Sequence, residues 1–347
     1  MPELAIIADD LTGALDAAAP FAARGIKTVV ALNAGALADA IASGARIVSV
    51  STDSREITPE AAAETVRRAL ASLPPGTAIF KKVDSRLKGN IAAELDAFTY
   101  QRSLVVPAIP DFARVTRNGQ IEGFGVSKPI DIADRLGTHA DRAHIPDAST
   151  SADIDRALAQ THDLAIGARG LAEAMARRMA PGADAAPIVL PQGKAYCVIG
   201  SQDPITLGQL ARLRATQHEM VDLLAPNGVA ALPTKTSSLT LIQAVPGAVA
   251  ADGKSVAMAL GASLARLKPG AGDLLVLSGG ATAQVILDAL GIEVLNLLGE
   301  VQPGLPIAHA GGLTVVTKSG GFGEPDCLSR LLAPYASARS LAQSHVR

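Results

Sequence analysis

The sequence predicts an α/β protein made of two α/β domains with mainly parallel sheets and a ligand-binding cleft between them. Short apolar runs alternate with alanine-rich helical patterns in both halves of the chain, which is typical of parallel strands joined by helical crossovers. Aromatic residues make up only 3% of a chain that is 48% hydrophobic. Ala, Leu, Val and Ile must therefore fill the core, as in sheets covered on both faces by helices. The length of 347 residues favours two domains over one.

In the first half, strands are expected within residues 4–10, 28–32, 45–54, 78–85 and 103–110, and helices within 12–25, 58–73 and 90–101. Gly25 suits a helix C-terminal stop. Thr58 suits a helix cap, with Pro59 at the first helical position. Between Gly119 and Asp153 the periodicity weakens, which predicts a polar connection, and the strand and helix pattern returns within residues 163–179.

The pattern restarts after a segment rich in Pro and Gly at residues 181–194, which we interpret as the linker between domains. The expected domains are 1–180 and 195–347. In the second half, strand, small-residue loop and helix follow one another within residues 196–213, 273–292 and 313–332.

Composition excludes several classes of function. The formal net charge is −2 and no dense run of Lys or Arg occurs, so we expect no nucleic-acid partner. No apolar stretch approaches the roughly 20 residues of a membrane helix, so we expect no membrane partner. The N-terminus lacks a signal-peptide pattern, and Cys197 and Cys327 have neither redox nor metal-ligand spacing. A cytoplasmic protein is therefore expected, and a homodimer is compatible with the sequence.

The loops after the second-half strands are rich in Gly, Ser and Thr. Glycine allows a phosphate to approach the backbone, and amide N–H groups at a helix start point toward an anion. One such loop is more often a simple tight turn, but three in one domain favour a phosphate-rich ligand such as ATP. The candidate nucleotide-binding residues are Ser201, Ser278, Gly279, Gly280, Ala281, Thr282, Lys318, Gly320, Gly321 and Gly323.

Standard nucleotide motifs are missing. Residues 246–255 resemble a Walker A loop, but five residues separate Gly247 from Gly253 where the motif has four. Asp252, just before Gly253–Ser255, also suits the start of a helix with no phosphate, and that interpretation is favoured. No GxGxxG follows the first strand, where Asp9 and Asp10 would repel a pyrophosphate.

Charged side chains follow the first-half strands instead. In open α/β sheets, ligands bind beyond the carboxyl ends of the strands. The candidate substrate-binding residues are Asp9, Asp10, Asp16, Lys82, Asp84, Ser85 and Arg86. Strand alternation sends Lys82 and Asp84 to one side and Lys81 to the other, and a small hydroxylated acid would suit this set. A solvated strand end with an internal ion pair is the alternative, and the helix dipole alone could explain Asp16.

Seven segments of the sequence, taken together and in order, resemble the signature blocks of the four-carbon acid sugar kinase family. They are "IADDLTGALDAA", "KKVDSRLKGNI", "VPAIPDFARVTRNGQ", "AIGARGLAEAM", "VIGSQDP", "LSGGAT" and "KSGGFG". The resemblance implies an ATP-dependent kinase that phosphorylates the terminal hydroxyl of erythronate, threonate or 3-oxo-tetronate, with Mg²⁺ as cofactor. It also implies an N-terminal substrate domain, a C-terminal nucleotide domain, and ATP contacts at Ser201, at 279–282 and at the glycines of the last block.

The sequence departs from the family pattern at Ala281, where an acidic residue is usual, and at Gly321, where asparagine is usual. We expect Asp10 to orient or deprotonate the attacking hydroxyl, with Asp84 as the second candidate, and Lys318 to neutralise phosphate charge. The metal ligands are left open. Two rival hypotheses are a sugar-acid binding protein without catalysis, because of Ala281, and a nicotinamide-dependent oxidoreductase, which the missing GxGxxG disfavours.

Overall fold

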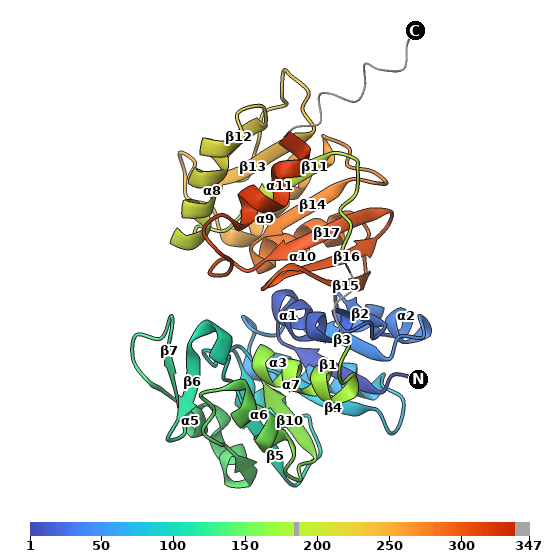
Figure 1. Ribbon diagram of the computed structural model, residues 1–347, viewed down its shortest axis with the longest axis vertical. Helices are drawn as coiled ribbons and strands as arrows, with labels where there is room; N and C mark the ends of the chain where they lie inside the picture. The colour runs from blue at the N-terminus through green and yellow to red at the C-terminus, as the bar shows by residue number, and fades with distance from the viewer. Residues whose placement is uncertain (184–186, 337–347) are drawn as a thin grey trace. The chain divides into compact units, whose positions relative to one another are not determined.

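The computed structural model describes residues 1–183 and 187–336, and these form two compact units (Figure 1). Unit 1 contains residues 1–186 and 293–299, and unit 2 contains 187–292 and 300–347. The first boundary falls inside the segment 181–194 that composition marks as a linker, of which residues 184–186 lie outside the described residues. The return of 293–299 to unit 1 has no counterpart in the sequence pattern.

Unit 1 is built on a sheet of order β15-β2-β3-β1-β4-β10-β5-β9, parallel throughout except for β15. The strands are β1 (Leu4–Ala8), β2 (Thr28–Ala31), β3 (Ile47–Ser51), β4 (Ala78–Lys82), β5 (Ser103–Val106), β9 (Ala143–His144), β10 (Leu164–Gly167) and β15 (Val294–Gln302). Residues 294–297 of β15 pair with β2. Apart from the edge strands, these are the strands that the first-half pattern predicts.

Helices cover both faces of this sheet. They are α1 (Leu11–Ala22), α2 (Leu37–Ala42), α3 (Pro59–Ala71), α4 (Ile91–Leu95), α5 (Ile132–Leu136), α6 (Ser151–Leu158) and α7 (Arg169–Met179). The buried aliphatic residues of α2, α3 and α4 form one core with β1, β2 and β3, whereas α1 packs against α7, and α7 against α6. The predicted Thr58 cap is confirmed, because its side chain accepts a hydrogen bond from Ala61 N. Helix α1 ends at Ala22 with Ala23 as its C-cap, and Gly25 lies two residues further on with φ +74°.

The segment after Gly119 is more ordered than the sequence pattern indicates. Strands β6 (Arg114–Arg117), β7 (Gln120–Gly123) and β8 (Ile130–Asp131) form a separate antiparallel sheet. The prediction of a polar connection was wrong because these strands are only two to four residues long. So short a strand shows too few alternations to be detected.

Unit 2 has a sheet of order β12-β13-β11-β14-β17-β16, in which β16 alone is antiparallel to its described neighbour β17. The strands are β11 (Ala195–Ile199), β12 (Val221–Pro226), β13 (Leu239–Val245), β14 (Leu274–Ser278), β16 (Leu305–Ala310) and β17 (Leu313–Lys318). The two-domain α/β class with mainly parallel sheets is thereby confirmed.

The helices of unit 2 are α8 (Pro204–Thr216), α9 (Gly253–Ala265), α10 (Gly280–Ala289) and α11 (Cys327–Ala336). Helix α8 packs against α11, and α9 against α10. The Walker-like segment ends in the start of α9, where the Asp252 carboxylate caps the helix by accepting from Ser255 N and Oγ at 2.9 and 2.6 Å. This confirms the helix-start interpretation of that segment.

Candidate active site

Strand order in unit 1 brings the carboxyl ends of β3, β1 and β4 together. Strand β1 lies between β3 and β4, and the chain after β1 first builds to one side and then crosses to the other. Ala8 pairs with Ser51 on one side and with Lys82 on the other, so the three strands end level. Such a topological switch point opens a crevice at the carboxyl edge of a parallel sheet. The residues after these three ends are therefore neighbours.

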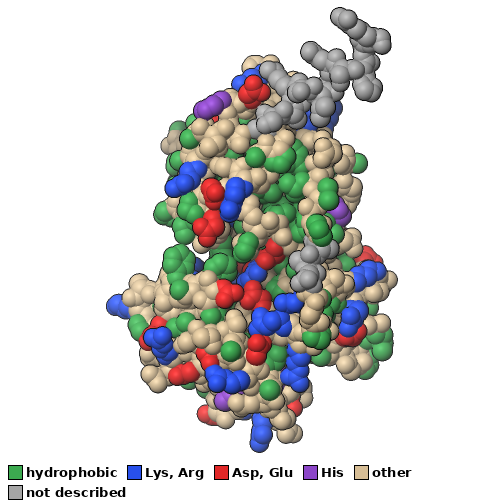
Figure 2. All heavy atoms as spheres, viewed as in Figure 1, with side chains coloured by type: hydrophobic (Ala, Val, Ile, Leu, Met, Phe, Trp, Pro, Cys, Tyr) green, Lys and Arg blue, Asp and Glu red, His purple; other side chains and the backbone are tan. Residues whose placement is uncertain are grey.

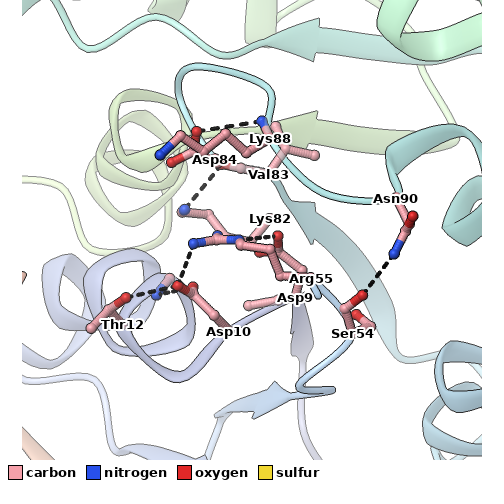
Figure 3. Close-up of polar contacts among 12 residues, drawn as sticks. Asp9, Asp10, Thr12, Ser54, Arg55, Lys82, Val83, Asp84, Lys88 and Asn90 are labelled. Carbon is pink, nitrogen blue, oxygen red and sulfur yellow. Dashed lines mark hydrogen bonds and ion pairs between the residues drawn. The ribbon is translucent and has the colours of Figure 1, made fainter. Parts of the chain in front are cut away.

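Arg55 binds both aspartates that follow β1 (Figure 3). Its Nε and Nη2 donate to the two oxygens of Asp9 at 2.7 and 2.8 Å, and its Nη1 donates to Asp10 Oδ2 at 2.5 Å. Asp9 is 3% exposed. Burial alone would raise its pKa, but the bidentate Arg55 fork outweighs burial, and the pKa of Asp9 lies below its ordinary value. Burial works against the charge on Arg55 as well, yet the carboxylates raise the pKa of Arg55.

Asp10 is also the cap of α1. Its Oδ1 accepts from Gly13 N at 2.7 Å, and its Oδ2 accepts from Thr12 Oγ1 at 2.9 Å. A capping carboxylate at a helix N-terminus is favoured by the helix dipole. The Asp10 side chain is 21% exposed against 4% for Asp9. Of the two aspartates, Asp10 is therefore the one that a ligand can reach.

Strand alternation separates Lys81 from Lys82 as the sequence predicts. Lys82 lies on the α1 side, where its Nζ donates to Val83 O at 3.0 Å, and a Cβ on Gly13 would lie 3.3 Å from this nitrogen. Lys81 is fully buried on the opposite side, with its Nζ 2.8 Å from Glu94 Oε2. That contact lacks hydrogen-bonding geometry and is an ion pair. Lys82 therefore lies on the same side of the sheet as α1, whereas Lys81 pairs with Glu94 on the opposite side.

The loop after β4 is folded around Asp84. Its Oδ2 accepts from the backbone N–H groups of Arg86 and Lys88 at 3.0 and 3.4 Å (Figure 3). Ser85 Oγ accepts from Arg114 Nη1 at 2.5 Å. Gly89 has φ +90°, and a Cβ there would lie 2.9 Å from Asp9 Oδ2, so this loop packs directly against the aspartates.

The structure does not bring Asp16 into this network. Asp16 Oδ1 accepts from Arg169 Nη1 at 3.1 Å, and Arg169 Nε donates to Glu173 Oε1 at 2.7 Å. The ion pair links α1 to α7 and gives Asp16 a structural partner in the second turn of α1.

Sequence reasoning chose neither Arg55 nor Arg114 as a site residue. Arg55 lies five residues beyond Val50 in a loop without periodicity. Its contacts with Asp9 and Asp10 follow only from the structure, in which β1 and β3 end level with each other. Arg114 belongs to the undetected three-stranded sheet. Its only sequence signal was its place in one of the family blocks.

Three turns meet at the carboxyl edge of the unit 2 sheet. Ile199, Ser278 and Lys318 end β11, β14 and β17 and pair with one another in register. Gly200 N donates to Ser278 O at 3.0 Å, and Gly279 N donates to Lys318 O at 3.1 Å. Gly279 has φ +106°, a conformation that strains any L side chain. The turns lead into α8 and α10 and present backbone amides at helix starts.

Close packing between these turns explains two of the glycines. A Cβ on Gly200 would lie 2.0 Å from Thr282 Oγ1, and a Cβ on Gly320 would lie 2.5 Å from Ser201 Oγ. Residues 200–201, 279–282 and 320 therefore form one contiguous surface. Ala281 is exposed on it, whereas Ser278 Oγ is buried without a hydrogen-bond partner among the described residues.

Lys318 does not point outward from this surface. The side chain is fully buried, and its Nζ donates to Thr206 Oγ1 at 2.9 Å, to Ser319 O at 3.1 Å and to Gly320 O at 3.2 Å. Burial lowers the pKa of Lys318 from 10.5 to about 8. The expectation that this ammonium neutralises phosphate directly is corrected here, because its three donors are used to hold the 319–320 turn.

Gln209 of α8 fixes the remainder of that loop. Its Nε2 lies within 2.9–3.1 Å of the carbonyl oxygens of Phe322, Gly323 and Glu324. Gly323 is packed at φ +90°, with a Cβ position 2.9 Å from Cys327 Sγ. Gly321 is less constrained, since its nearest side-chain atom would be Asp203 Oδ2 at 3.5 Å. Hydrogen bonds from Lys318 and Gln209 thus fix the conformation of residues 319–324.

Metal-ligand clusters and membrane helices were searched over residues 1–183 and 187–336. No group of three or more His, Cys, Asp or Glu side chains there could hold a metal ion. None of the helices in those ranges combines the length and apolar character needed to cross a membrane. On the face drawn in Figure 2, Lys and Arg side chains alternate with Asp and Glu and form no continuous basic surface.

Family models match nearly the whole chain. Residues 4–232 match a model described as a sugar-binding N-terminal domain, and residues 232–328 match one described as a nucleotide-binding C-terminal domain. The first match extends past the unit boundary through β11, α8 and β12.

Curated proteins match over similar lengths. A D-threonate kinase of Cupriavidus necator is 31% identical, over 93% of this chain and 95% of that protein. A D-threonate kinase of Bordetella bronchiseptica is 29% identical, over 95% and 96%. A 3-oxo-tetronate kinase of Methylobacterium radiotolerans is 25% identical, over 95% and 98%.

Solved structures share the fold. A Salmonella typhimurium LT2 protein that carries a provisional tRNA synthase description superposes with a TM-score of 0.74 at 20% identity, over 96% of this chain and 99% of that one. A Haemophilus influenzae protein from a family catalogued as a domain of unknown function superposes with a TM-score of 0.67 at 20% identity, over 95% and 99%. At this identity the likeness concerns the fold alone.

Proposed function

The chain belongs to the four-carbon acid sugar kinase family, and we propose that it transfers the γ-phosphate of ATP to the terminal hydroxyl of a four-carbon sugar acid. D-threonate is the first choice of acid, because two relatives that match over nearly their whole length act on it by name. D-erythronate and 3-oxo-tetronate are the alternatives.

One observation carries the proposal: two groups of residues with complementary chemistry lie at the carboxyl ends of parallel strands, one group in each unit. In unit 2, three small-residue turns present amides at the starts of helices, which suits a triphosphate. In unit 1, aspartates and cations are held together by hydrogen bonds, which suits an acid that carries hydroxyl groups. Phosphoryl transfer then asks the protein mainly for positioning and charge stabilisation.

On the nucleotide side, the backbone N–H groups of Ser201 and of residues 280–282 would hold the phosphates, because those of Gly200 and Gly279 already donate to Ser278 O and Lys318 O. Ser278 Oγ, buried and without a partner among the described residues, supplies a further hydroxyl at the same edge. Lys318 acts indirectly, by holding the carbonyls of Ser319 and Gly320 inward. The N–H groups of Gly320 and Gly321 would thereby be left to face the ligand, whereas Phe322 N donates to Ser319 O at 3.2 Å.

The residues fit a magnesium ion that is carried mainly by the nucleotide. Mg²⁺ in kinases is bound through substrate phosphates, waters and one or two carboxylates. Asp203 is the carboxylate among residues 200–203, 278–282 and 318–323, and its Oδ2 lies beside Gly321. Asp203 would therefore hold the ion, which neutralises charge on the phosphates when bound.

On the acid side, Asp10 is the residue that orients the attacking hydroxyl. Its carboxylate is fixed by Gly13 N, Thr12 Oγ1 and Arg55, so it can accept a hydrogen bond from a substrate without first being ordered. Asp84 is the second candidate, because one of its oxygens already accepts hydrogen bonds from backbone N–H groups of its own loop. Lys82 and Arg86 place positive charge beside the acid.

The test is a coupled ADP-release assay with Mg-ATP and a panel of four-carbon acids, read together with thermal shifts for each ligand alone. The proposal predicts ADP release that depends on one acid of the panel and stabilisation by Mg-ATP. Stabilisation by an acid without any by Mg-ATP, and without turnover, would instead identify a sugar-acid binding protein.

A further inference from the structure

Arg114 is a buried cation without an acidic partner among the described residues. The residue begins β6 of the three-stranded sheet and is 5% exposed. No carboxylate of residues 1–183 or 187–336 lies within ion-pair distance of its guanidinium. The other buried arginine of unit 1, Arg169, pairs with Asp16 and Glu173. Of these two buried arginines of unit 1, Arg114 is therefore the one without an acidic partner among the described residues.

Neutral acceptors hold the guanidinium in one orientation. Nη1 donates to Ser85 Oγ at 2.5 Å, and Nε and Nη2 donate to Phe124 O at 3.0 and 2.7 Å. An arginine has five N–H donors in a fixed fork, so two N–H groups have no acceptor in these contacts. The guanidinium is therefore fixed in orientation, and two of its N–H donors are available to a ligand.

The electrostatic surroundings make this an unfavourable place for an isolated cation. Burial lowers the pKa of Arg114, the nearby Arg86 lowers it further, and Asp84 opposes them through space without an ion pair. Burying a charge costs free energy unless the charge is paired. Two neighbouring guanidinium groups and an incomplete hydrogen-bond set are instead what an anion-binding site contains before its anion arrives.

The position of Arg114 ties this fork to the candidate acid site. Ser85 and Arg86 follow β4 in the same loop whose Gly89 packs against Asp9. Gly125 lies on the other side of the fork, where a Cβ would be 3.0 Å from Arg114 Nη2. Glycine at that position keeps side-chain atoms away from the guanidinium.

We propose that Arg114 binds the carboxylate of the four-carbon acid, with Ser85 fixing the orientation of the fork and Arg86 adding positive charge. The inference rests on the proposed function, and it refines it. It assigns the carboxylate to Arg114, which leaves Lys82 to the hydroxylated part of the substrate near Asp10. It also makes Arg114 the residue that selects an acid over a neutral polyol.

The experiment compares D-threonate with threitol, in which a hydroxymethyl group replaces the carboxylate. Arg114→Gln should raise KM for D-threonate about 10- to 100-fold, as expected for loss of a charge-assisted hydrogen bond. The kcat/KM for threitol should change less than about twofold, since threitol offers the fork no charge. Arg117→Gln is the matched control, because Arg117 ends the same strand with its side chain exposed, and it should leave both substrates unaffected.

Binding supplies a second readout. D-threonate alone should raise the Tm of the wild-type protein and of Arg117→Gln, but not that of Arg114→Gln. If Arg114→Gln does not fold by circular dichroism, Arg114→Lys carries the test. This variant keeps the charge and loses the fork, and its KM for D-threonate should still rise severalfold with threitol unchanged.

Two failures are distinguishable. A wild-type protein that turns over no four-carbon acid contradicts the proposed function. A wild-type protein that turns over D-threonate, while the Arg114 variants keep its KM or lose both substrates equally, overturns only the role of Arg114.

Discussion

The pairing of Arg55 with Asp9 is the contact on which the geometry of the unit 1 site depends most. Asp9 is almost completely buried, and both of its oxygens accept from one guanidinium. Arg55→Gln would leave that carboxylate buried without its cation. Breaking a buried pair in this way typically costs 3–5 kcal/mol. Because the Arg55 side chain is 20% exposed and water can partly replace it, we expect about 3 kcal/mol.

The matched control is Arg46→Gln. Arg46 makes the same two-pronged contact with Glu3, at 2.6 and 2.9 Å, but both side chains are about half exposed. A surface pair of this kind contributes about 0–1 kcal/mol. Urea unfolding followed by circular dichroism at pH 7 should therefore separate the two variants by about 2 kcal/mol or more. The double variant Asp9→Asn/Arg55→Gln should recover much of the loss, because an amide carries no charge to bury.

The pH dependence has a definite sign. In the wild type the pKa of Asp9 is lowered, so its stabilising contribution is present above the unfolded pKa of 3.8 and is lost as pH falls below it. In Arg55→Gln, burial without the cation should raise that pKa. The deficit of the variant should then be largest at pH 7 and shrink as pH falls toward 4. A loss no greater than that of Arg46→Gln, or a deficit independent of pH, would refute the reasoning.

Three further perturbations test other parts of the structure. Asp10→Asn should lower kcat at least about 100-fold in the ADP-release assay while leaving the Mg-ATP thermal shift intact, and near-normal turnover would remove Asp10 from its role. Gly200→Ala should cost about 1–3 kcal/mol and weaken the Mg-ATP shift, because its Cβ would meet Thr282 Oγ1 at 2.0 Å. Gly208→Ala, at a position with nothing within 4 Å, should be neutral or stabilising, and equal behaviour of the two alanines would contradict the packing. The pKa of Lys318 is lowered from 10.5 to about 8. Burying the charged ammonium therefore lowers the free energy of unfolding by about 3 kcal/mol below pH 8, and this loss is relieved as pH rises from 8 to 10.5. Wild-type stability measured against Lys318→Met should therefore rise across that window, and a flat difference would contradict it.

The sequence predicts the parallel strands β1, β11 and β14 well because each ends in a change of chemistry, whereas the parallel strands β12 and β13 were not predicted. Asp9 follows an apolar run directly, and Gly200 and Gly279 mark the strand-to-helix turns of unit 2. At these places the hydrophobic periodicity and the turn residues predict the same strand end. The antiparallel strands β15 and β16 escaped prediction because no helix follows either of them, although Pro303–Gly304 and Gly311–Gly312 mark their turns. The strands of the small sheet are too short to show a period.

The site could be located from sequence but its contacts could not. Strand ends identify Asp10, Lys82 and Asp84 as neighbours, since parallel strands end at one edge. Nothing local indicates that Arg55 bridges two aspartates or that Arg114 lacks an acidic partner, because both facts depend on loops packed over long sequence separations. The inward direction of Lys318 was missed for a related reason. Its acceptor Thr206 lies 112 residues away.

The central claim is that unit 2 binds the nucleotide and unit 1 binds the acid. Hydrogen–deuterium exchange of the full chain, measured with each ligand alone, tests it most directly. Mg-ATP should protect amides at 200–206, 278–283 and 318–323, and D-threonate should protect those at 9–13, 54–55 and 83–90. Protection by both ligands within one unit, or the reverse assignment, would contradict the account.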